Sequence, residues 1–163
     1  MKKSWLAALM LAVLLLPGAA LAQSAVVNNG SDPSSRLNMR SAPSRDAQAV
    51  GKFVSGTQVE ILSDEGNGWA LVRIGSGDAG VTGYMMRDYL KDSSSVDARE
   101  RRAVASPYGT QSVVLRNRPS NSYHPVAMLA VGEMVTVIGV SGDFCYVVTG
   151  GGQVGCLLSG ELR

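Results

Sequence analysis

The sequence predicts an all-β protein made of two small antiparallel barrels in tandem, and an internal repeat is the main observation behind this prediction. Residues 36–90 and 112–162 are two versions of one element, because moving the chain by 76 positions places Arg40 on Arg116. Self-similarity at a fixed offset over about 50 residues indicates two copies of one folding unit. The second observation is that short runs in both copies alternate between apolar and polar residues, as half-buried strands do.

Turn residues divide each copy into short strands. In the first copy the expected strands are residues 37–40, 59–61, 69–73 and 84–86, with a glycine-rich loop over 74–83. In the second copy they are residues 113–116, 134–140, 144–149 and 153–158. Strands this short, separated by Gly, Asn or Asp, are typical of a small antiparallel barrel or sandwich. A unit of roughly 50 residues buries only about 60% of its chain surface, so each copy is expected to be marginally stable alone.

The first 22 residues have the pattern of an export signal. Lys2 and Lys3 precede an apolar run of 12 residues, and residues 20–22 form an Ala-Leu-Ala cleavage motif before Gln23. The run is shorter than the roughly 20 apolar residues that cross a bilayer. We therefore expect a mature chain that starts near Gln23, has no membrane span and is secreted or held in the cell envelope. An uncleaved N-terminal anchor is the alternative.

The charge balance argues against nucleic acid as a partner. Losing Lys2 and Lys3 with the leader leaves 13 basic residues against 13 acidic ones. A nearly neutral chain lacks the bulk positive charge that attracts nucleic acid or anionic membranes. The basic run at 99–102 is expected to be a solvated face of a linker.

These observations divide the chain into five parts. They are a signal peptide (1–22), an N-terminal extension (23–35), a first domain (36–90), a linker (91–111) and a second, divergent domain (112–163). The linker is expected to be solvated because it is rich in Ser, Asp, Arg and Glu.

Several strings in the first copy carry a family resemblance. They are LNMRSAPS at 37–44, GTQVEIL at 56–62, GW at 68–69, GYM at 83–85 and YL at 89–90. In this order they resemble the bacterial SH3-like (SH3b) domain over the whole first copy. The second copy matches more loosely, with Cys145 and Cys156 where the first has Trp69 and Tyr84. Residues 26–29 also resemble a leader of exported SH3b proteins, which implies an added strand ahead of the first copy. The resemblance implies an SH3-like barrel for each copy and a targeting role, in which the partner is peptidoglycan, another cell-envelope polymer or an envelope protein.

The best candidate ligand-binding residues lie in the first copy. Strand alternation turns Ala70 and Val72 toward the core and Trp69 outward, and an exposed Trp beside Tyr84 would make an apolar platform for sugar rings or peptide backbone. Tyr89 would extend this platform. The alternative is that these aromatic side chains only cover an open end of the barrel.

Arg40 is a further candidate for the ligand site. Because Arg116 matches it in the second copy, both arginines are also consistent with a shared structural task, such as pairing with a loop carboxylate. The sequence leaves these two roles open.

We expect no catalytic residues, no metal and no cofactor, and hence a non-catalytic binding module. His124 is the only histidine, and a Cys–His pair with Cys145 would suggest a peptidase. However, His124 lies beside Pro125 in an expected loop, and no motif places an orienting group. An accessory protein that binds an envelope protein by strand addition is the main alternative. A small cell-wall hydrolase is a remote one.

Two cysteines in an exported chain favour a disulfide over a metal site. A two-residue turn at 150–151 would place Cys145 directly opposite Cys156, at a Cα separation of about 5.5 Å that a disulfide accepts. Gly152 would permit a bulge that changes this register. Two separately buried thiols are the alternative.

Overall fold

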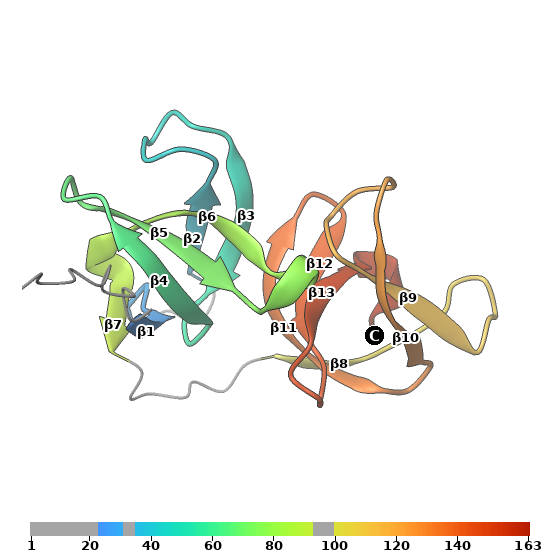
Figure 1. The fold of residues 1–163 in the computed structure, drawn as a ribbon. Helices are drawn as coiled ribbons and strands as arrows, with labels where there is room; N and C mark the ends of the chain where they lie inside the picture. The colour runs from blue at the N-terminus through green and yellow to red at the C-terminus, as the bar shows by residue number, and fades with distance from the viewer. Residues whose placement is uncertain (1–22, 31–34, 93–99) are drawn as a thin grey trace, which may run out of the picture.

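Within the described residues the regular elements are antiparallel β-strands and three short 3-10 turns, which confirms the predicted all-β class. The structure, a computed structural model, describes residues 23–30, 35–92 and 100–163 (Figure 1). The predicted signal peptide and residues 93–99 of the predicted linker lie outside the described residues. None of the helices in the described ranges is long and apolar enough to cross a membrane.

The described strands form two units, which we call the first unit (23–92) and the second unit (100–163). The first unit contains β1 (Gln23–Val27), β2 (Arg36–Arg40), β3 (Ala49–Val54), β4 (Gln58–Asp64), β5 (Trp69–Ile74), β6 (Val81–Met86) and β7 (Leu90–Asp92), with 3-10 turns η1 (Gly77–Ala79) and η2 (Arg87–Tyr89). The second unit contains β8 (Arg101–Ala103), β9 (Ser112–Arg116), β10 (Pro125–Ala130), β11 (Met134–Ser141), β12 (Phe144–Val148), β13 (Val154–Leu158) and the 3-10 turn η3 (Ser159–Glu161).

The two units pair their strands in the same order. The first runs β3-β2-β6-β5-β4-β1 and the second β10-β9-β13-β12-β11-β8, all antiparallel. The last strand of the first unit, β7, pairs with β1, and the corresponding Leu162 forms a bridge with Val104. The repeat in the sequence is therefore a repeat of strand pairing.

The sequence missed four strands. The expected set lacked β3, its counterpart β10 and the short β7, and β8 lies where a solvated linker was expected. The linker prediction is wrong at this point because β8 pairs with β11 and the next residue, Val104, is fully buried. The strand expected in the N-terminal extension is present as β1, which pairs with β4.

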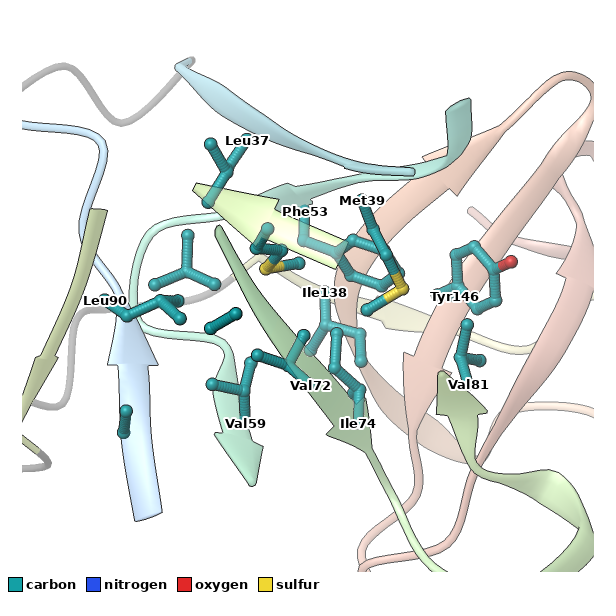
Figure 2. Close-up of a cluster of buried hydrophobic side chains, with 14 of the residues drawn as sticks. Leu37, Met39, Phe53, Val59, Val72, Ile74, Val81, Leu90, Ile138 and Tyr146 are labelled. Atoms are coloured by element: carbon teal, nitrogen blue, oxygen red, sulfur yellow. The ribbon is translucent and has the colours of Figure 1, made fainter. Parts of the chain in front are cut away.

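One hydrophobic core crosses from the first unit into the second. Figure 2 shows Ile138 and Tyr146 of the second unit in the same cluster as Met39 and Phe53 of the first. The rings of Phe53 and Tyr146 have centroids 4.9 Å apart, and β3 pairs directly with β11. The units therefore share a core, which offsets the small core available to each alone.

The predicted disulfide between Cys145 and Cys156 is wrong: both residues are buried free thiols. The turn holds three residues, because Thr149 N donates to Gln153 O at 2.9 Å and Gly152 adopts φ +81°. A glycine in the left-handed region after a tight turn is the common three-residue hairpin with a bulge.

The extra turn residue moves the strand register by one position. Cys145 therefore lies opposite Leu157, and Cys156 lies opposite Tyr146. A slip of one residue sends side chains to the opposite face of a sheet. Cys145 accordingly joins the core of the second unit, and Cys156 joins the core between the units.

Candidate functional site

A groove of about 380 Å³ lies on the first unit where β2, the start of β5 and the end of β6 meet. Four of its lining residues are apolar or aromatic: Leu37, Trp69, Met86 and Tyr89. Trp69 and Met86 are directly opposite each other on neighbouring strands, and Tyr89 follows in the turn η2. The groove therefore combines aromatic surface with a fixed strand framework.

Three arginine side chains line the same groove: Arg36, Arg40 and Arg45. Arg36 and Arg40 lie on one face of β2, because alternate residues of a strand point the same way. Arg45 lies in the loop that joins β2 to β3. In the described part of the chain no Asp or Glu lines the groove, so its surroundings favour an anionic ligand.

Local hydrogen bonds hold Arg40 in place. Its Nη1 donates to the carbonyl oxygen of Ala47 at 2.7 Å, and Ser41 N donates to Gln48 O at 3.0 Å across the same loop. These bonds fold the β2–β3 loop back on itself. They fix one side of the guanidinium and leave further N–H groups for a ligand, since arginine carries five donors.

Asn29 adds a polar group to the groove. Its Nδ2 donates to the carbonyl oxygens of Ser35 and Phe53 at 3.2 and 3.3 Å. Its Oδ1 is buried and accepts no hydrogen bond from the described residues. A buried acceptor without a donor costs free energy, so this oxygen is a local cost of the fold rather than a contact open to a ligand.

The groove brings together three of the four predicted ligand residues. Arg40, Trp69 and Tyr89 line it, whereas Tyr84 is not among its lining residues. Tyr84 lies beside the groove, opposite Arg40 on the neighbouring strand, and is half-buried. The expectation that Trp69 is exposed is wrong, since only 9% of its surface is accessible.

Sequence reasoning missed most of the charge in this groove. Arg36 could have been found, because it stands two positions before Asn38 and four before Arg40 on an alternating strand. Arg45 and Met86 carried no comparable signal. The loop fold places Arg45, and the pairing of β6 with β5 places Met86 beside Trp69.

The corresponding place in the second unit is closed by an internal ion pair. Arg116, the counterpart of Arg40, donates from Nη1 to Glu161 Oε2 at 2.7 Å and from Nη2 to Glu161 Oε1 at 3.0 Å. The hydrogen bonds to Glu161 raise the pKa of Arg116 above its usual value. Arg116 also lies over the ring of Tyr123, 5.0 Å from its centroid.

Strand register also corrects the expected match of Trp69 with Cys145. Trp69 is opposite Met86 and Phe144 is opposite Leu158, so Phe144 is the structural counterpart of Trp69. Cys156 does occupy the position of Tyr84, because each lies opposite the matched arginine.

The strand face of the second unit that carries Phe144, Tyr146 and Cys156 packs against the first unit. Burial raises the pKa of Cys156 to about 12. In the first unit the equivalent strand face carries Trp69 and Tyr84. In the second unit this face is buried in the contact between the units.

Comparison with known proteins finds a family match within the first unit. Residues 35–91 match the model of the bacterial SH3 domain. The chain is also 28% identical over 125 residues to YrvJ of Bacillus subtilis (strain 168), a protein named as an N-acetylmuramoyl-L-alanine amidase. This match covers 73% of the chain and 23% of the amidase, so the chain spans about a quarter of that relative's length.

Two solved structures are also similar to the chain. NlpC1 of Trichomonas vaginalis is 18% identical with a TM-score of 0.40, and the match covers 94% of this chain and 50% of NlpC1. NlpC2 of the same organism is 16% identical with a TM-score of 0.39, and the match covers 87% of this chain and 48% of NlpC2.

Proposed function

We propose, from the bacterial SH3 domain that residues 35–91 form, that this protein is a non-catalytic module which binds the bacterial cell wall. The observation that carries the proposal is the groove on that domain, where Trp69, Tyr89 and three arginines converge. Aromatic surface suits sugar rings and peptide backbone, and guanidinium groups suit carboxylates. Peptidoglycan presents all of these groups.

Similarity to an amidase supports the choice of ligand. The matched region covers most of this chain but only 23% of the amidase, as expected for a module shared between proteins rather than for a whole enzyme. We propose that the second unit is a divergent copy of the same domain, because its strands pair in the same order. Export through the predicted leader, with a mature start near Gln23, belongs to the same proposal.

A pull-down on purified peptidoglycan sacculi tests the proposal. The chain from Gln23 onward should sediment with sacculi, and Tyr89→Ala should weaken binding by about tenfold, as expected for an aromatic anchor. Tyr108→Ala is the matched control, because Tyr108 is 82% exposed and lies outside the groove. Equal binding by the Tyr89 and Tyr108 variants would remove the groove from the proposal.

Enzyme activity and mature start are checked with the same material. Incubation with sacculi should release no soluble fragments, whereas release by the purified protein would show a hydrolase. N-terminal sequencing of the exported protein should begin near Gln23. A start at Met1 with membrane retention would contradict the predicted leader.

The second candidate function is binding of an envelope protein by strand addition. It is favoured by the position of β10 at one end of the strand order, where Met128 is 62% exposed. A strand with a free edge can accept a strand from a partner. Capture of an envelope protein in a proteomic pull-down, without binding to sacculi, would favour this function over the first.

A further inference from the structure

The two units place the same arginine in different surroundings. Arg40 ends β2 and lies opposite Tyr84 of β6, and Arg116 ends β9 and lies opposite Cys156 of β13. The two guanidinium groups therefore leave equivalent points of one strand arrangement. Any difference in their partners comes from neighbouring residues rather than from the fold.

In the second unit the partner of this arginine is a carboxylate. Glu161 is the last residue of η3 and precedes Leu162, as Tyr89 is the last residue of η2 and precedes Leu90. Glu161 accepts two hydrogen bonds from Arg116 and one from Leu158 N at 2.8 Å, and it is only 5% exposed. In the second unit, the last residue of the 3-10 turn therefore carries a buried carboxylate that is joined to the arginine by two hydrogen bonds.

Among the described residues of the first unit, no carboxylate takes the place of Glu161. Tyr89 stands in place of Glu161, and within the described residues Arg40 donates only to Ala47 O. Arg36 and Arg45 add two more positive charges to the groove, and no described Asp or Glu lines it. An arginine cluster beside an open groove is suited to an external carboxylate.

We infer that the groove of the first unit binds a carboxylate of the cell-wall peptide, held by Arg40 in the way that Arg116 holds Glu161. Arg45 supplies a second cation at the loop, and Trp69 and Tyr89 contact the peptide beside the carboxylate. The inference rests on the proposed cell-wall function and names the chemical group that the groove takes. In the second unit Glu161 already pairs with Arg116, so we expect no binding of this ligand there.

A substitution that copies the second unit into the first gives a direct test. Tyr89→Glu should bring a carboxylate to Arg40 and so compete with the ligand, whereas Tyr89→Gln changes the same side chain without adding charge. Tyr89 is 40% exposed, so both variants should fold. Because hydrogen bonds to charged groups are stronger than those between neutral groups, we expect Tyr89→Glu to bind sacculi at least about tenfold more weakly than Tyr89→Gln.

Chemical modification of the carboxylates in sacculi provides a second test of the inference. Sacculi whose carboxylates have been converted to amides should lose most of the binding that untreated sacculi show. If wild-type protein binds both preparations equally and the two Tyr89 variants are equal, the carboxylate inference is wrong while cell-wall binding stands.

A soluble peptide tests the carboxylate inference independently of cell-wall binding, and so remains informative if the protein does not bind sacculi. N-acetyl-alanyl-alanine with a free carboxylate should shift the NMR signal of the Trp69 indole N–H in the full mature chain, and its C-terminal amide should not. Failure to bind sacculi would overturn the proposed function. Equal effects of the acid and the amide, or no effect of either, would overturn the carboxylate inference.

Discussion

Glu161 shows how one residue can change the use of a shared fold position. Its carboxylate is buried, accepts two hydrogen bonds from the guanidinium of Arg116 and accepts a third from the backbone N–H of Leu158. The first unit has Tyr89 at this place and leaves a groove open beside Arg40. A single exchange of an acidic for an aromatic residue thus separates a closed site from an open one.

We predict that Glu161→Gln lowers the free energy of unfolding by about 3 kcal/mol, because removing one partner of a buried pair leaves the other charge uncompensated. Glu60→Gln is the matched control. Its partner Arg73 lies at 3.3 Å, but both side chains are more than one-third exposed, so the expected loss is below about 1 kcal/mol. Urea denaturation of both variants measures the difference, and equal losses would contradict the assigned role of Glu161.

The two cysteines give a second prediction at this scale. Two free thiols per chain should react with a thiol reagent when the protein is unfolded without reductant. In the folded protein at pH 8, Cys156 should react very slowly, because it is buried and its pKa is raised to about 12. If the unfolded, unreduced chain had no reactive thiols, the two cysteines would form a disulfide after all.

At the scale of elements, the β12–β13 hairpin decides where its side chains point. The turn over residues 149–153 places Gly152 in the left-handed region, and this one extra residue sends Cys145 and Cys156 to opposite faces. The hairpin is consequently built to fill two cores rather than to be joined by a covalent bond.

We predict that Gly152→Ala destabilises the protein by roughly 1–2 kcal/mol, because a Cβ is unfavourable at positive φ. Gly150→Ala in the same turn is the control, since Gly150 lacks a positive φ and a Cβ there meets nothing within 4 Å. Thermal or urea unfolding compares the two. Equal stability of both variants would argue against the three-residue turn.

At the scale of the whole molecule, contact between the units leaves no room for added atoms. A Cβ on Gly139 would lie 2.7 Å from Lys52 O and from a Phe53 ring atom, and one on Gly51 would lie 2.7 Å from the Tyr146 ring. Thr57 Oγ1 also donates to Ile138 O at 3.2 Å across the units. The two units are therefore fitted to each other, and a flexible tandem is not what the structure shows.

We predict that the mature chain unfolds in a single transition. In a chain that starts at Gln23, Trp69 is the only tryptophan, so its fluorescence reports on the first unit while far-UV circular dichroism reports on both. The two urea curves should coincide. Gly139→Ala should lower the free energy of unfolding by about 1–3 kcal/mol, because the added methyl group overpacks the contact between the units. Both curves should therefore shift together to lower urea concentration. Separate transitions would indicate two independent domains.

The sequence by itself determined the all-β fold class, the positions of most strands and three of the residues that line the groove. Alternation and turn residues are local signals, and they located strands such as β4, β5 and β11. They also pointed to Arg40, Trp69 and Tyr89, which the groove brings together. The strands β3 and β10 escaped notice, although the repeat matched their positions, because neither run alternates clearly.

Only the tertiary structure decided the hairpin register, the shared core and the closure of the second site. One residue more in the turn moves every following side chain to the other face, and consecutive glycines give the chain no local preference between the two registers. The burial of Tyr146 against Phe53 and the pairing of Arg116 with Glu161 join residues far apart in the chain. Such contacts depend on how strands pack in space, which a local pattern does not encode.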